Sequence, residues 1–179
     1  MVWLINAFKK PRLPPWLRRR RAACGGISVI GSDDFIECTT AALELLRTTT
    51  HYPDIQRYVS VIKQGRRSGM WAQAKRPTFV VGRRTWSHSS LWYAGAIAHD
   101  AYHSKLYHDA KRGTAHPPAD CWTGPEAERK CLAFQIEALT ALGADDATVA
   151  YLEKLRKNPT YQGHHKGWRS WRDYFRRRW

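Results

Sequence analysis

The sequence predicts one α+β domain, and three observations support this prediction. Short β-branched segments lie in the middle of the 179-residue chain, and longer segments with a helical repeat of apolar residues follow them. Hydrophobic residues make up 43% and aromatic residues 12% of the chain, which is enough for a packed core and excludes global disorder. No apolar stretch approaches the ~20 residues needed to cross a bilayer, which excludes a helical membrane protein.

The first part of the chain predicts one helix and three strands. Ser32 and the two aspartates after it are typical of a helix N-terminus, and an apolar face continues to about residue 48. Residues 58–63 alternate and are β-branched, which predicts a strand. Residues 70–74 are expected to form a short strand, and residues 78–81, between a proline and a glycine, a stronger one.

Three helices are expected in the second part of the chain. Serines offer N-caps for a long helix over residues 90–110. A second helix begins with Pro125 in its first turn and ends at Gly143, a residue that favours helix C-termini. A third helix is predicted over residues 145–157, before an Asn-Pro pair.

Charge divides the chain into a nearly balanced body and two basic ends. The net charge is +15. Residues 1–24 hold seven basic and no acidic residues, and residues 164–179 hold six basic and one acidic residue. We therefore expect a basic N-terminal extension (1–24), a metal-binding domain (25–163) and a basic Trp/Arg-rich tail (164–179). Such extensions either bind nucleic acid or another anionic surface, or remain solvated.

The N-terminal residues argue against a secretory signal. Residues 1–8 are fairly apolar, but the basic run follows them, whereas in a signal peptide the basic residues come first. We therefore expect a cytoplasmic protein with reduced cysteines, whereas export by another route would allow two disulfides.

The segment Ala98-His99-Asp100-Ala101-Tyr102-His103 contains the most informative pattern in the sequence. Two histidines four residues apart on a helix share one face and can reach one metal ion. Here that face is apolar and is expected to be buried, whereas His108 projects to the opposite side. The alternative is a pair of core or surface histidines that bind nothing.

Glu128 is the best candidate for a third ligand. A zinc site with an open position takes three protein ligands. Glu128 lies in the apolar stripe of the second long helix, whereas Glu126 and Glu137 fall on its polar face. A carboxylate in an apolar stripe is costly unless it is paired or bound to a metal. The alternative is an acid that stabilises the first turn of the helix.

The segments SSLWYAGAIAHDAYH and EAERKCLAFQIEALTALG, with the strand TFVV before them, resemble the zincin metallopeptidases of the gluzincin type. The resemblance covers about residues 32–143. It implies a small sheet packed on the active-site helix, zinc held by His99, His103 and Glu128, and a peptide or protein substrate. It also implies that the strand at residues 78–81 is the edge strand that binds extended peptides. Cys131 stands where the family often has alanine.

Asp100 occupies the position of the general base, where this family has glutamate. A carboxylate there takes the proton of the attacking water and passes it to the leaving amine. Aspartate is one methylene shorter, and a shift of ~1 Å can reduce a rate by about 10²-fold. A slow peptidase, a re-spaced site and an inactive relative all remain open. Tyr102, Tyr161, His164 and His165 are candidates for oxyanion stabilisation.

Two other functions compete with this hypothesis. The His99-Asp100 doublet also resembles the HD-type phosphohydrolases, in which His88 would be an added ligand and Asp109 or Asp120 the distal acid. Such a site prefers manganese, magnesium or iron to zinc. The second alternative is a binding module whose C-terminal tail stacks on bases or lies at a membrane surface. In that tail Trp168, Trp171 and Phe175 share one helical stripe, which more often docks on the protein itself.

Overall fold

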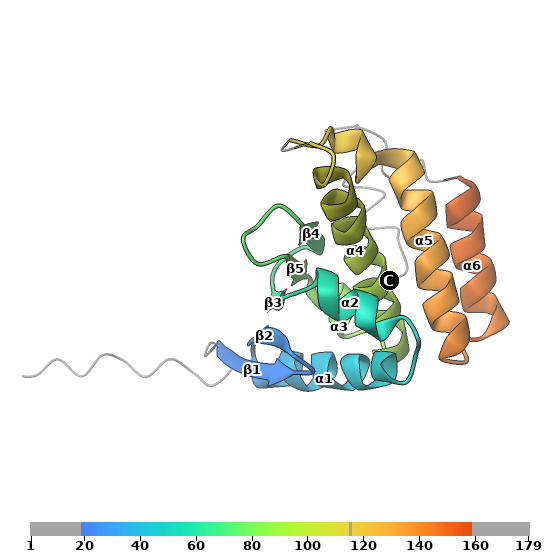
Figure 1. Cartoon of the computed structure of the whole chain (residues 1–179). Coiled ribbons are helices and arrows are strands. Elements are labelled where there is room, and N and C mark those ends of the chain that lie inside the picture. Colours follow the sequence, from blue (N-terminus) through green and yellow to red (C-terminus); the bar gives the residue numbers. More distant parts are fainter. Residues whose placement is uncertain (1–18, 115, 159–179) are drawn as a thin grey trace, which may run out of the picture.

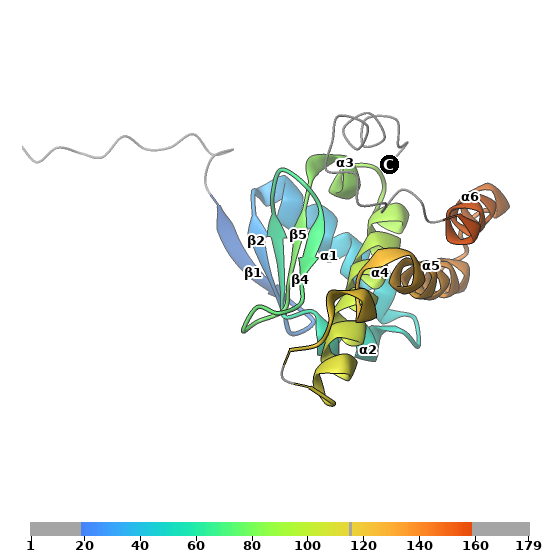
Figure 2. The same ribbon diagram turned by 90° about the horizontal axis from the view of Figure 1, so that it is seen from above.

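A computed structural model describes residues 19–114 and 116–158 as a mixed α+β domain. Five strands form one sheet in the order β1-β2-β3-β5-β4. The helices pack on one side of this sheet, and α5 and α6 form an outer layer beyond α4 (Figures 1 and 2).

The sheet has a parallel centre and two antiparallel edge strands. The strands are β1 (Arg20–Cys24), β2 (Ile27–Gly31), β3 (Val61–Gln64), β4 (Gly69–Trp71) and β5 (Thr78–Val81). β2, β3 and β5 run parallel, whereas β1 and β4 run antiparallel to their neighbours and form the two edges. The strand at residues 78–81 is therefore internal. The expectation that it is the peptide-binding edge is wrong, because β4 pairs with its outer side.

Three of the longer helices begin at side-chain caps that the sequence supplies. The helices are α1 (Asp33–Arg47), α2 (Tyr52–Tyr58), α3 (Arg83–Trp86), α4 (Ser90–Lys111), η2 (Ala119–Cys121), α5 (Gly124–Ala141) and α6 (Asp146–Lys157). The side chains of Ser32, Ser89 and Asp145 accept hydrogen bonds from backbone N–H groups in the first turns of α1, α4 and α6. These caps fix where α4, which carries the two histidines, begins.

The core lies between the sheet and the pair α1 and α4. Phe79 and Ile62 project from the sheet onto this pair, and Phe35 and Tyr93 face them from the helices with no exposed surface. The Tyr93 hydroxyl lies 3.0 Å from the Thr39 hydroxyl, so its one polar group is satisfied in the core. α4 is thereby held rigidly on its sheet side.

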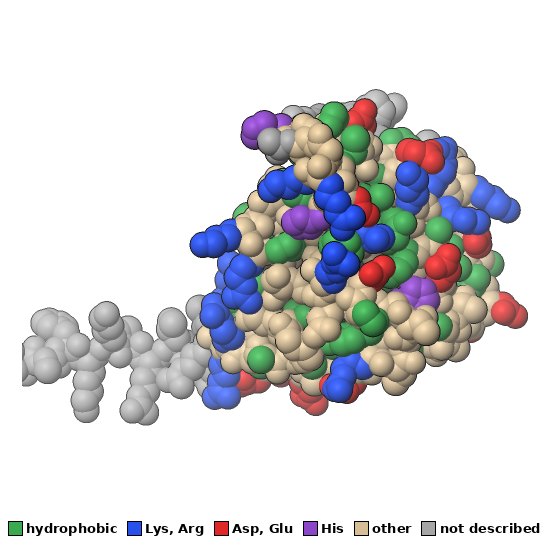
Figure 3. Space-filling model, in the orientation of Figure 1, with side chains coloured by type: hydrophobic (Ala, Val, Ile, Leu, Met, Phe, Trp, Pro, Cys, Tyr) green, Lys and Arg blue, Asp and Glu red, His purple; other side chains and the backbone are tan. Residues whose placement is uncertain are grey.

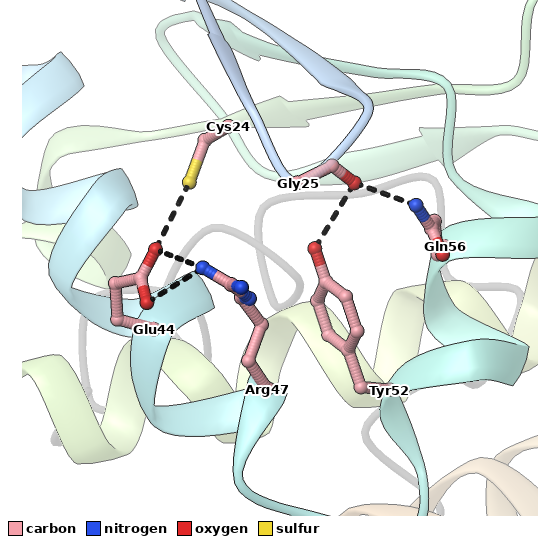
Figure 4. A network of polar contacts seen from close by, with 6 residues as sticks. All are labelled: Cys24, Gly25, Glu44, Arg47, Tyr52 and Gln56. Carbon is pink, nitrogen blue, oxygen red and sulfur yellow. Dashed lines mark hydrogen bonds and ion pairs between the residues drawn. The ribbon is translucent and has the colours of Figure 1, made fainter.

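The β1–β2 hairpin is tied to the helices at its turn (Figure 4). The carbonyl oxygen of Gly25 accepts hydrogen bonds from the Tyr52 hydroxyl (3.1 Å) and from Gln56 Nε2 (2.8 Å). The backbone φ of Gly25 is 52°, a left-handed conformation that favours glycine. Beside the turn, Glu44 binds Arg47 at 2.9 Å and accepts a weak bond from the Cys24 thiol at 3.9 Å.

The structure confirms most of the expected elements and corrects two. The expected α+β class, the helix at 32–48, the strand at 78–81 and the three later helices are present within a few residues. In the segment 58–63, only residues 61–63 are in a strand, because Tyr58 ends α2. Residues 20–24 belong to the sheet as β1, so the folded body begins earlier than the expected boundary at residue 25.

Candidate metal centre

Two packed helices bring His99, His103 and Glu128 together. The Nε2 atom of His99 lies 3.2 Å from one oxygen of the Glu128 carboxylate, and that of His103 lies 3.0 Å from the other. The two Nε2 atoms are 3.2 Å apart. The exposed fractions of the three side chains are 15%, 11% and 2%. The three residues predicted from helical spacing on α4 and α5 therefore converge in a nearly buried place.

The outer nitrogens of both imidazoles are held by oxygen acceptors. His103 Nδ1 donates to the backbone carbonyl of Trp122 at 2.8 Å, and His99 Nδ1 lies 3.1 Å from the amide oxygen of Gln135. A carbonyl oxygen can only accept, so Nδ1 of His103 carries a proton. In a neutral imidazole the Nε2 atom then carries a free lone pair. This is the arrangement that metal-binding histidines use.

The Glu128 carboxylate and the two Nε2 atoms converge, and a positive charge between these acceptors stabilises the arrangement. In the metal-free protein a proton supplies it: burial alone would lower the pKa of His103, but hydrogen bonds with Cys131 and Glu128 raise it well above its ordinary value. Burial raises the pKa of Glu128, but its hydrogen bonds with the two histidines outweigh this effect and lower it strongly. A divalent cation can take the place of this proton.

The spacing of the acceptors fits a tetrahedral ion. Zinc lies about 2.0–2.1 Å from histidine nitrogens and carboxylate oxygens, so neighbouring ligands are about 3.3–3.4 Å apart. The observed separations are 3.0–3.2 Å. The two histidines lie closest to different oxygens of Glu128, so a rotation of this carboxylate that directs one oxygen at both Nε2 atoms would complete such an arrangement.

Cys131 is a member of the centre that the sequence analysis did not assign. The thiol lies one turn after Glu128 on α5 and is fully buried. The ligand atoms of His99, His103 and Cys131 lie within 4.8 Å of one another, so this group could hold a metal ion. Burial raises the pKa of the Cys131 thiol to about 11, although its hydrogen bond with His103 acts in the opposite direction. Its position on the same face as Glu128 was visible in the helical spacing, but that position is equally typical of core packing.

Asp100 directly follows His99 on α4 and lies next to the centre. Its side chain is partly buried, and no hydrogen bond or ion pair to it occurs within the described residues. Burial raises the pKa of Asp100 to about 6, although the neighbouring His99 and His103 lower it in part. A perturbed carboxylate in such a place is a candidate general base.

The acids that the sequence placed on the polar face of α5 lie there in the structure. Glu126 pairs with Arg129 at 2.6 Å, and Glu137 lies 3.6 Å from His51. Both glutamates are about two-thirds exposed, at 68% and 66%, so neither contributes to the centre.

The additional groups expected for a phosphohydrolase make other contacts or are exposed. The His88 ring packs on Trp92, before the middle of α4, and about 14 Å of helix separate Ser90 from His99. Asp109 pairs with Lys105 at 3.5 Å, and Asp120 lies exposed on η2. His108, which was expected to face away, stacks on Tyr58.

The remaining candidates divide into one residue inside the structure and several outside it. Tyr102 packs against Phe134 with ring centroids 4.9 Å apart. Tyr161, His164 and His165 lie outside the described residues, as do the basic end at residues 164–179 with its aromatic stripe and residues 1–18 of the basic extension.

Comparison of the chain with protein-family models, with curated protein sequences and with solved structures finds no match. None of the helices in ranges 19–114 and 116–158 is long and apolar enough to cross a membrane. Because the comparisons find no match, the geometry of the centre is the basis for its proposed chemistry.

Proposed function

We propose that the chain is a zinc-dependent, metallopeptidase-like hydrolase with a zincin-like domain. His99, His103 and Glu128 hold the zinc ion, and Asp100 is the general base. The convergence of three acceptor groups at 3.0–3.2 Å in a nearly buried place supports this best. The oxygen acceptors on the outer imidazole nitrogens orient both rings, as the hydrogen-bond partners of zinc-binding histidines do.

Each residue of the centre has a distinct task in this proposal. A zinc ion held there supplies a Lewis acid that activates water and polarises a carbonyl group. Gln135 and the carbonyl of Trp122 keep both imidazoles in the Nδ1–H form, so that both Nε2 lone pairs stay directed at the centre. The Asp100 carboxylate accepts a proton from water and returns it to the amine nitrogen of the leaving group.

An extended peptide is the substrate class that the surroundings of α4 favour. β4 is an edge strand that is antiparallel to β5 and contacts α4. The open side of such a strand offers backbone N–H and C=O groups to a peptide in an extended conformation. A phosphoester substrate would gain nothing from this edge.

The Cys131 thiol supports a second candidate function, a non-catalytic zinc site. With Cys131 as a fourth protein ligand the site would be closed, and closed sites are structural. Cobalt in place of zinc distinguishes the two functions, because a thiolate bound to cobalt gives a charge-transfer absorption in the near ultraviolet. The hydrolase predicts no such absorption and an unchanged cobalt spectrum in Cys131→Ser.

Substitution of Asp100 tests the hydrolase directly. Asp100→Asn should keep one zinc ion per chain and lower casein hydrolysis by about 10²–10⁴-fold, because an amide cannot accept the proton. Asp100→Glu restores the usual carboxylate length and should keep or raise the activity. Metal content and hydrolysis of casein and of a phosphoester are measured for the parent and both variants.

Two results would contradict the proposal. A parent protein that binds no divalent metal has no zinc centre. Loss of metal in Asp100→Asn, together with phosphoester hydrolysis by the parent, would make Asp100 a ligand and favour the phosphohydrolase.

A further inference from the structure

The face of the sheet turned away from the helices forms a second surface of interest, which we call the outer face. Side chains alternate along each strand, so those next to the buried residues Ile62 and Phe79 point outward. The strand register places the outward residues in two rows across the sheet. These rows are Arg21–Ile30–Lys63–Val80–Gly69 and Ala23–Ser28–Val61–Thr78–Trp71.

Positive charge is concentrated at this face. Residues 55–99, which include β3, β4 and β5, contain eight basic residues and no acidic one. Lys63 lies on the outer face itself, whereas Arg66 and the pair Lys75 and Arg76 lie exposed in the loops at its two ends. Figure 3 shows Lys and Arg side chains gathered along the edge of the molecule that carries the strands.

Trp71 is the one large apolar side chain found exposed within the described ranges, with an exposed fraction of 62%. It stands at the end of β4, opposite Thr78 in the outer row, and the basic loop with Lys75 and Arg76 follows it. An exposed indole among cations can stack on an unpaired base, while the cations neutralise the phosphates on either side.

We propose that the outer face binds single-stranded nucleic acid. Trp71 stacks on a base, and Lys63, Lys75 and Arg76 contact phosphates. Five strands at a spacing of about 4.8 Å give a platform about 19 Å wide, which is enough for several nucleotides. The surface is separate from the metal centre, so the proposal does not depend on the proposed hydrolase.

Two other partners fit this surface less well. Described residues place no helix on the outer face that could enter the major groove of a duplex. Membrane binding uses a stripe of exposed apolar side chains, whereas Ile30 and Val80 in the outer rows are half-buried and Val61 is buried, which leaves Trp71 as the one large apolar side chain that is mainly exposed among the described residues. Unpaired bases need a single stacking platform and a positive track, and both are present.

The test compares two triple variants of the full chain that lose the same charge. The face variant carries Lys63→Ala, Lys75→Ala and Arg76→Ala. The control variant carries Lys130→Ala, Lys154→Ala and Lys157→Ala, three exposed positions on α5 and α6. Because both lose three positive charges, general attraction by the basic ends of the chain is affected equally. Circular dichroism verifies that each variant is folded.

The readout is the anisotropy of a fluorescent 12-nucleotide single strand of mixed sequence, measured over a range of salt concentrations. Each phosphate contact contributes about 0.7 to the salt slope for single strands, so the face variant should lose about 2 units of slope. The control variant should keep the slope of the parent. Equal losses in the two variants would overturn the proposal, because the attraction would then be general.

Trp71→Ala tests the stacking contact separately from charge. It should weaken binding by about 5- to 150-fold at an unchanged salt slope, and Trp71→Phe should restore most of the affinity. Unchanged affinity in Trp71→Ala would overturn the proposal. Vesicles with anionic lipids that bind in a Trp71-dependent way, while the oligonucleotide does not, would replace it with a membrane surface.

Discussion

The metal centre and the outer face of the sheet use polar groups in opposite ways. In the centre, three side chains with exposed fractions of 2–15% point at one another, and the position of each imidazole is fixed by a further hydrogen bond. On the outer face, cations are spread over strands and loops and remain in contact with water. The first arrangement fixes the positions of individual ligand atoms, whereas the second produces a positive electrostatic potential over a surface.

This difference predicts different sensitivities. A buried cluster depends on atomic positions, so the loss of one partner is costly and salt has little effect. An exposed array depends on the sum of its charges, so each one contributes little and salt weakens all of them. α4 carries the two histidines and packs on the inner side of the sheet, and among the described residues no polar side chain belongs to both regions. Substitutions in one region should therefore leave the other unchanged.

The largest expected effect is the loss of metal on removal of both histidines. The double variant His99→Ala and His103→Ala should lower zinc from one ion per chain to background, because two of three nitrogen and oxygen donors are gone. Oligonucleotide affinity should stay at the parental value. Metal content is measured by elemental analysis after dialysis.

A matched pair of histidines outside the centre provides the control. The double variant His88→Ala and His108→Ala also removes two imidazoles from the same part of the chain. It should keep the zinc. Glu128 is nearly fully buried and loses two partners in the histidine variant, so folding is verified by circular dichroism. If that variant is unfolded, Glu128→Gln replaces it. Full zinc occupancy in a folded His99 and His103 double variant would contradict the assignment of these histidines as zinc ligands.

Helical spacing was sufficient to find most of the centre. His99, His103 and Glu128 follow from two periodic segments, and the Ser89 cap fixes where α4 starts. These features are local, so the sequence contains them directly. Cys131 lies on the same helical face, but a buried cysteine usually packs as a small apolar residue, so spacing alone could not distinguish a ligand from a core residue.

Features that depend on how elements meet could not be predicted in this way. Gln135 reaches His99 only because α5 packs against α4 in the observed position. The carbonyl of Trp122 is a backbone group that any residue type would supply, so the sequence does not mark it. The β1–β2 hairpin was missed because residues 20–24 begin with two arginines and alternate weakly. Its pairing becomes favourable only when Cys24 and Ile27 are buried against the helices.

An intermediate effect is expected from Gln135→Met. Methionine keeps the volume of the buried side chain but offers no strong acceptor to His99 Nδ1, so the imidazole is free to rotate or change tautomer. Zinc affinity should fall by about 10- to 100-fold, while oligonucleotide binding stays unchanged. Competition with a chromophoric chelator measures the affinity. Gln135→Glu keeps an oxygen acceptor and should keep most of the affinity, whereas equal losses in both variants would show that packing alone matters there.

The smallest effect is expected where neither region is touched. Gly25 has φ 52°, and a Cβ added there would meet the Tyr52 hydroxyl. Gly25→Ala should therefore lower the free energy of unfolding by about 1–2 kcal/mol through the left-handed backbone, and by more if Tyr52 is displaced. Zinc and oligonucleotide affinities should both stay at the parental values, because the β1–β2 turn shares no residue with the metal centre or with the proposed contacts of the oligonucleotide. Urea unfolding measures the stability.

Adding Tyr52→Phe removes the hydroxyl that the new Cβ would meet and should recover only the steric part of the loss. Gly69→Ala, where a Cβ meets no atom within 4 Å, should cost less than Gly25→Ala. A change in zinc affinity in folded Gly25→Ala would show that strain in the sheet reaches the centre through α4, and the two regions would then not be independent.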